Sequence, residues 1–199
     1  RRFTVDRNGH PWLGVHWIML QGLKYNLDAN HGPGSYWPSS MRGRTCGWIG
    51  SLRADRKEML ETMSAIFPDC YLHVEKDFMG PMNPRVYAEL LDDIIFGLSP
   101  IGFNAETHRM AEIMDHGAIP AMLAAEYLWA PYQPVPGVIA DDWAAVADAM
   151  LTLRNGPAIN LLRLQERVVK WNEKYRSCVT NDLKIILDHA MQTDATSIR

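Results

Sequence analysis

One stretch of the sequence indicates the fold class: residues 96–122 read FGLSPIGFNAETHRMAEIMDHGAIPAM. The stretch opens within an apolar run, Ile94–Leu98, which has the length of a buried strand and is too short for a helix. The run ends at a turn signal, Ser99-Pro100-Ile101-Gly102, because a proline disfavours helical backbone at the residue before it and a glycine readily adopts a positive φ. The sequence therefore predicts a buried strand that ends in a glycine-containing loop.

A helix is expected after this loop, since Met110, Ile113 and Met114 have the spacing of one buried helical face. Gly117 is a favourable C-terminal stop, and a second short strand is expected at residues 118–123. Strand, glycine loop, helix and strand together make one βαβ unit. In such units ligands gather at the carboxyl ends of the strands, beside helix N-termini that favour anions.

The same alternation continues on both sides of this unit. Apolar runs predict strands at residues 46–50, 70–74 and 138–139, and helical patterns fall at residues 56–63, at 85–93 and after residue 142. The expected helix N-caps are Asn104, Asp55 and either Asp141 or Asp142. This order predicts an α/β fold with a doubly wound parallel sheet. Two amphipathic helices are expected to follow it, at residues 157–176 and 181–191.

The helix expected after Gly102 carries a charged pair, Arg109 and Glu112. The two residues are three apart, so their side chains are neighbours on the helix surface. A guanidinium group matches phosphate oxygens, and a carboxylate accepts hydrogen bonds from the paired hydroxyls of a sugar. The spacing by itself favours a plainer interpretation, a surface ion pair worth about 0–1 kcal/mol.

A second candidate group follows the strand expected at residues 46–50. Gly50 and Ser51 form the exit from this strand, and Arg53 and Arg56 flank the start of the next helix. Cations at a helix N-terminus oppose the helix dipole unless an anion lies among them. This local conflict makes the two arginines candidates for phosphate binding, with solvated surface arginines as the alternative.

The motif that joins these residues resembles that of a known family. The pattern Ser99-Pro100-x-Gly102, Glu106-Thr107-x-Arg109-x-x-Glu112, Gly117-x-Ile119-Pro120 is similar to the nucleotide-sugar motif of exostosin-type glycosyltransferases and of the ribitol xylosyltransferase group. The resemblance extends over residues 44–175. One departure is Ala121, where the family usually has valine, and this changes packing more than chemistry.

The resemblance implies roles for the candidate residues. Glu112 would hold the ribose of a sugar nucleotide, and Arg109 with the loop before it would lie near the diphosphate. The arginines after the first strand of the nucleotide domain would also approach the diphosphate. The implied donor-binding set is Gly50, Ser51, Arg53, Arg56, Ser99, Gly102, Arg109 and Glu112.

The resemblance further implies the GT-B architecture, which has two Rossmann-like halves. Residues 44–156 would form the donor-binding half, with residues 1–43 as a linker or remnant of the N-terminal acceptor domain and residues 157–199 as C-terminal helices. The implied reaction is an inverting transfer of a hexosyl or pentosyl group from a nucleoside diphosphate sugar to a glycan or glycoprotein acceptor, without a bound metal or other cofactor.

The implied enzyme needs more than this chain contains. An inverting transfer requires a general base at the acceptor hydroxyl, and in this fold the base normally comes from the N-terminal half of the same enzyme. No residue here is assigned that role, and the chain is expected to be inactive alone. The family's location would be the Golgi or endoplasmic reticulum lumen, reached through a membrane anchor outside this sequence.

Composition excludes some classes of function. The 199 residues carry a formal net charge of −3 with scattered basic residues, so the chain lacks the electrostatic footprint of a nucleic-acid-binding protein. Cys46, Cys70 and Cys178 form no CxxC pair, which argues against a zinc site. Buried thiols are expected for Cys46 and Cys70, and one disulfide is the alternative if the chain is lumenal. The start, Arg1-Arg2-Phe3, suggests a fragment or a trimmed domain.

Two other functions compete with sugar transfer. A doubly wound sheet does not specify chemistry, so a non-catalytic nucleotide-binding or protein-interaction domain is the main alternative. In that case Glu112 would be a surface ion-pair residue, and no sugar nucleotide would bind. A Rossmann-like oxidoreductase is disfavoured because no G-x-G-x-x-G follows the first expected strand.

Overall fold

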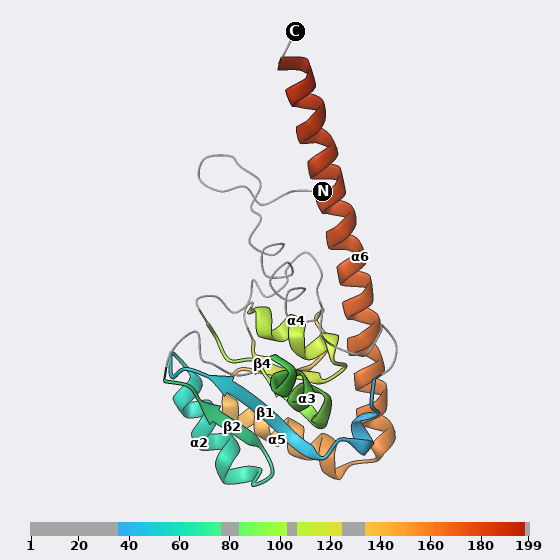
Figure 1. Cartoon of the computed structure of the whole chain (residues 1–199). Helices are drawn as coiled ribbons and strands as arrows, with labels where there is room; N and C mark the ends of the chain where they lie inside the picture. Colours follow the sequence, from blue (N-terminus) through green and yellow to red (C-terminus); the bar gives the residue numbers. More distant parts are fainter. Residues whose placement is uncertain (1–35, 77–83, 103–106, 125–133, 198–199) are drawn as a thin grey trace.

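A computed structural model of the chain describes residues 36–76, 84–102, 107–124 and 134–197 (Figure 1). Within these residues the chain forms a five-stranded, all-parallel sheet in the order β2-β1-β3-β4-β5. Helices cover both faces of the sheet, which confirms the doubly wound, Rossmann-like fold. The residues assigned to a linker or N-terminal remnant lie mostly outside the described part of the chain.

The strands alternate with helices along the chain as the sequence predicts, with boundaries that shift by a few residues. The elements are η1 (Ser39–Met41), β1 (Arg44–Gly50), α2 (Arg56–Ile66), β2 (Tyr71–Val74), α3 (Pro84–Asp93), β3 (Ile94–Leu98), α4 (His108–Asp115), β4 (Ile119–Leu123), β5 (Val138–Ala140), α5 (Trp143–Asn155) and α6 (Ala158–Ser197).

The strand order places a topological switch point between β1 and β3. From β1 the chain passes through α2 to β2 on one side, and from β2 it returns through α3 to β3 on the other side. The crossovers therefore leave β1 and β3 in opposite directions at the carboxyl edge of the sheet. In open α/β sheets, ligands bind in the crevice at this position.

Two glycines, Gly47 and Gly97, leave room for apolar side chains on the face of the sheet that α3 and α4 cover. They are paired partners in β1 and β3. A Cβ atom added at Gly97 would lie 2.4 Å from the Cγ1 atom of Ile113 on α4, and one added at Gly47 would lie 2.8 Å from Ile94. This face is sealed by a small apolar cluster that contains Leu91, Ile94, Ile113 and Ala118.

The opposite face carries most of the core and is covered by α2 and α5, which pack against each other. The fully buried side chains of this region include Trp48 from β1, Met59 and Met63 from α2, and Trp143 and Met150 from α5. Each of the two helices therefore buries an apolar face against the sheet.

Two helix termini have the capping residues that the sequence predicts, and two differ from the prediction. After α4, Gly117 has φ 63° and the amide of Ala118 bonds to the carbonyl of Ile113, a Schellman ending. Asp142 caps α5 by accepting a bond from the Ala145 amide at 2.7 Å. The N-cap position of α4 is Thr107, and the expected cap, Asn104, lies outside the described residues. At the start of α2, Asp55 occupies the N-cap position, but its carboxylate makes no capping bond.

The amino edge of the sheet is fixed by Arg42, which is buried just before β1. Its guanidinium donates to the carbonyls of Trp37, Leu91, Ile94 and His116 at 2.7–3.1 Å. A buried charge is stabilised when its hydrogen bonds are satisfied in this way. Arg42 therefore ties the chain entering β1 to the ends of α3 and α4.

Cys46 and Cys70 form a disulfide between β1 and the residue that precedes β2. The expectation of two buried thiols is therefore wrong for this pair. The two residues lie beside each other because β1 and β2 are adjacent parallel strands, a pairing that sequence separation alone does not reveal. Cys178 is a free cysteine on α6.

The two helices expected after residue 157 are one continuous helix, α6, of 40 residues. The expected break fell at Ser177–Thr180, where weak helix formers cluster, but no glycine or proline interrupts residues 158–197. Figure 1 shows the second half of α6 (red) extending well past the sheet and its helices. None of the described helices combines the length and apolar character needed to cross a bilayer.

The close approach at Gly97 gives a stability prediction. Gly97→Ala is expected to lower the free energy of unfolding by about 1–3 kcal/mol, because the new methyl group overlaps the branched side chain of Ile113. Chemical denaturation measures this loss. The Gly97→Ala/Ile113→Ala double variant should lose less than the two single variants added together, since truncating Ile113 makes room for the methyl group. Simple additivity would contradict the overlap.

The disulfide gives a second prediction. Cys46→Ala/Cys70→Ala is expected to lose about 3 kcal/mol of unfolding free energy, the stabilisation typical of a cross-link across a loop of this length. The two residues are 24 apart in sequence. Denaturation with and without dithiothreitol supplies the control, because the reductant should destabilise the wild-type chain and leave the double variant unchanged. An equal effect of reductant on both proteins would contradict the assignment.

Candidate functional site

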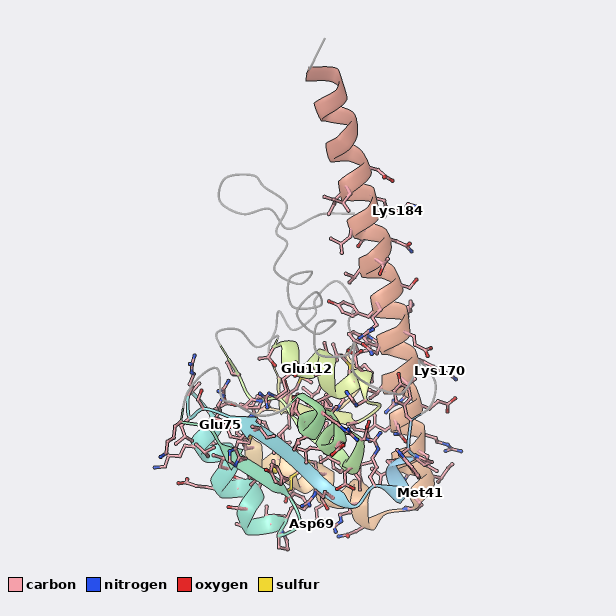
Figure 2. All side chains as sticks on the ribbon, viewed as in Figure 1. Met41, Asp69, Glu75, Glu112, Lys170 and Lys184 are labelled. Atoms are coloured by element: carbon pink, nitrogen blue, oxygen red, sulfur yellow. A yellow bond between two sulfur atoms is a disulfide. The ribbon has the colours of Figure 1, made fainter. Side chains whose placement is uncertain are left out.

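The switch point brings together the two loops that the sequence singled out. The loop after β1 runs from Ser51 to Asp55, and the loop after β3 begins at Ser99 and is described as far as Gly102. Asp69 and Glu75, labelled in Figure 2, flank β2 and mark the amino and carboxyl edges of the sheet. Both loops lie at the carboxyl edge, where the βαβ pattern predicted a ligand site.

Asp55 joins these loops directly. Its Oδ1 atom accepts a hydrogen bond from the Ile101 amide at 3.1 Å, and its Oδ2 atom accepts one from the indole Nε1 of Trp143 at 2.8 Å. Trp143 is the first residue of α5 and is fully buried. One carboxylate therefore connects the loops after β1 and β3 with the start of the helix after β5.

Arg109 reaches from α4 across to β1. Its Nη1 atom donates to the carbonyl oxygen of Ile49, next to the end of the strand. Its guanidinium carbon lies 5.8 Å from the ring centroids of both Trp48 and Tyr87, within cation–π range. The Arg109 charge is thus held at the switch point by a carbonyl and two aromatic rings.

Arg56 approaches the same tryptophan from α2. Its guanidinium carbon lies 5.7 Å from the Trp48 ring, and its Nη1 atom donates to the Ser51 carbonyl at 2.6 Å. Within the described part of the chain its Nε atom is buried without a hydrogen-bond partner. Burial, followed by the charges of Arg109 and Arg53, lowers the pKa of the Arg56 guanidinium. Three cationic side chains therefore lie close enough to repel one another.

Glu112 lies deeper than a surface ion-pair residue would. It is 4% exposed, and its Oε2 atom accepts a hydrogen bond from the hydroxyl of Tyr87 on α3 at 2.9 Å. Burial, followed by the charge of Glu112, raises the pKa of that hydroxyl. Figure 2 shows Glu112 on α4, on the side of the sheet that α3 also covers. Because Arg109 and Glu112 bond to different elements, the surface-pair interpretation does not describe this carboxylate.

The remaining candidates border the crevice in different ways. Ser99 is 2% exposed, and its hydroxyl lies 3.0 Å from that of Thr107 at the start of α4. Gly50 leaves room for the Trp48 ring, because a Cβ atom there would lie 2.8 Å from it. Its carbonyl accepts a bond from the Glu75 amide. Gly102 ends the described part of its loop.

Sequence reasoning missed the aromatic part of this site. Trp48 and Tyr87 are the rings against which the arginines lie, yet both fall within ordinary strand and helix patterns. The role of Asp55 was also missed, because its position predicts a helix cap. The cluster of cations at the start of α2 was the available signal for the site, since these cations do lie at this edge of the sheet.

A cavity lies between α3 and the strands β1 and β2, and none of the candidate donor-binding residues lines it. Its volume is about 240 Å³, and it is lined by Arg44, Ile49, Tyr71, Val86, Glu89, Leu90 and Asp93. Its charged residues are paired, Arg44 with Asp93 and Glu89 with Arg85. The cavity therefore offers no concentrated charge comparable with that of the switch point.

The arrangement at the switch point suits an anion. Guanidinium groups, a buried N–H without a partner among the described residues, and the N-termini of α2 and α4 at the same edge of the sheet favour phosphate oxygens electrostatically. Comparison with models of known protein families and with curated protein sequences finds no match to this chain. A functional assignment therefore depends on the fold and on the residues themselves.

The Tyr87–Glu112 bond gives a testable consequence. Tyr87→Phe is expected to lower the free energy of unfolding by about 1–3 kcal/mol, because it leaves a buried carboxylate oxygen without its donor. Glu112→Gln retains an acceptor for the tyrosine hydroxyl, so it should lower the free energy of unfolding by less than Tyr87→Phe does. Urea denaturation of the wild type, both single variants and the double variant gives the coupling between the two positions. Additive effects would show that this hydrogen bond contributes nothing to stability.

Proposed function

We propose that this chain is the donor-binding domain of a glycosyltransferase with GT-B architecture, and that it binds a nucleoside diphosphate sugar at the switch point. The observation that supports this most is the convergence of Arg56 and Arg109 on Trp48, beside Arg53, at the carboxyl edge of a doubly wound sheet. The motif over residues 99–120, which resembles that of exostosin-type enzymes, supplies residues to the same crevice.

In this proposal the arginines bind the diphosphate. Their charges would neutralise the negative charge that builds up on the departing nucleoside diphosphate, which is electrostatic stabilisation by groups already in place. Among the described residues, the guanidinium groups of Arg56 and Arg109 contact carbonyl oxygens and aromatic rings, and the neighbouring Asp55 carboxylate offsets only part of the charge repulsion on Arg56. Such partners stabilise a guanidinium without cancelling its charge.

Glu112 is proposed to accept hydrogen bonds from the ribose hydroxyls. An ionised carboxylate has about four acceptor sites, so the bond from Tyr87 leaves capacity for a sugar diol. The burial of Glu112 limits this role to a ligand that enters the crevice beside α4. The tyrosine would then orient the carboxylate.

The acceptor and the general base are proposed to belong to another part of the enzyme. On α6 the apolar side chains of Ile185 and Leu187 are 54% and 59% exposed, and apolar side chains exposed in this way suit contact with a partner domain. The Cys46–Cys70 disulfide agrees with an oxidising compartment such as the secretory lumen.

The test is calorimetric titration of the chain with a panel of nucleoside diphosphates and their sugars. Arg56→Met and Arg109→Met are each expected to weaken binding by about 10- to 150-fold, the loss of one charge-assisted contact. Arg167→Met, at an exposed position on α6, is the matched control and should leave the affinity unchanged. Glu112→Ala should weaken the binding of ribose-containing nucleoside diphosphates more than the binding of inorganic pyrophosphate.

The competing function is a protein-interaction domain that binds no nucleotide. A folded wild-type chain that fails to bind every nucleotide in the panel would favour that alternative. Equal losses in Arg56→Met and Arg167→Met would indicate a diffuse charge effect in place of a defined site.

A further inference from the structure

We propose that Asp55 is the positioning residue of this site, and that its carboxylate sets the distance between the two loops that hold the diphosphate. The inference rests on the proposed function, because it concerns how the same site keeps its affinity. It begins from a local anomaly: Asp55 occupies the N-cap position of α2 and makes no capping bond.

An aspartate at an N-cap ordinarily bonds to backbone amides of its own helix, which is worth about 1 kcal/mol. Here both carboxylate oxygens are directed to other parts of the fold, to the Ile101 amide and the Trp143 indole. These partners are 46 and 88 residues away in the sequence. The carboxylate therefore joins the loops after β1 and β3 to the start of α5, and it does not cap its own helix.

The position of this junction connects it to the anion site. Asp55 immediately precedes Arg56, and Ile101 lies between Ser99 and Gly102. A movement of Asp55 or of Ile101 displaces a residue that we assign to the diphosphate. Ala54, directly before Asp55, has a positive φ of 42°, so the backbone enters this junction in a conformation uncommon for a residue with a side chain.

A different role for Asp55 would be simple charge balance, since its carboxylate lies beside a group of arginines. The two roles predict opposite results for Asp55→Asn. Removing one negative charge near cations should tighten anion binding if Asp55 acts through its charge alone. Removing the junction should weaken binding, because the asparagine amide presents a donor where Asp55 presents an acceptor to Ile101 or Trp143.

The experiment uses the full chain and two probes, inorganic pyrophosphate and the nucleoside diphosphate that binds best. We expect Asp55→Asn to weaken both by about 5- to 100-fold, the range for a lost hydrogen-bonding interaction to a charged group. Trp143→Phe preserves the charge and removes one hydrogen-bond donor, so it should weaken the binding of both probes, as Asp55→Asn does. Asp142→Asn is the matched control, because it removes a charge at the exposed N-cap of α5 and leaves both hydrogen bonds of Asp55 in place.

Hydrogen exchange of the ligand-free protein provides a readout that does not depend on any nucleotide. The Ile101 amide should exchange faster in Asp55→Asn than in wild type or Asp142→Asn. Unchanged or tighter pyrophosphate binding in Asp55→Asn, with a wild-type chain that binds, overturns the positioning role and leaves the proposed function standing. A wild-type chain that binds neither probe overturns the proposed function. If the exchange rate of the Ile101 amide is also unchanged in Asp55→Asn, the hydrogen-bonded junction is contradicted as well.

Discussion

The close approach of α3 and α4 to the sheet is the constraint on which the rest of the structure depends. Gly47 and Gly97 are paired in β1 and β3; a methyl group at Gly97 would overlap Ile113 on α4, and one at Gly47 would overlap Ile94 at the start of β3. Because α4 lies this close, Arg109 can reach the carbonyl at the end of β1, and Tyr87 on α3 can reach the carboxylate on α4. The site at the carboxyl edge is thus a consequence of how tightly one face is packed.

Much of the fold could be predicted because its signals are local. The β3 run is apolar and ends at a proline, and Gly117 ends α4 with the positive φ that its position requires. The site was only partly predictable, because its geometry arises from residues brought together by β1–β3 pairing. Asp55 illustrates the limit: the local rule predicts a cap, whereas the folded chain offers the carboxylate two donors from distant parts of the sequence. The Cys46–Cys70 bond likewise depends on which strands are neighbours.

The electrostatics of the crevice are unfavourable when it holds no anion. Arg56 loses solvation and is repelled by Arg109 and Arg53, and these effects lower its pKa. Carbonyl oxygens, the Trp48 ring and the neighbouring Asp55 carboxylate offset part of this cost. A fold that retains such repulsion gains stability whenever an anion binds, because a ligand that binds only the native state shifts the folding equilibrium towards it. Stability and occupancy of this crevice are therefore linked.

The long helix α6 has a geometric consequence of its own. Its first turns belong to the core through Leu161, Leu164 and Val168, and the last of its fully buried described side chains is Val179. The helix continues to Ser197, so at 1.5 Å per residue it carries the chain about 27 Å beyond that point. A continuous helix of this kind resists bending, because no proline or glycine interrupts it. A partner that binds the far end of α6 is therefore held at a fixed distance and orientation relative to the carboxyl edge of the sheet.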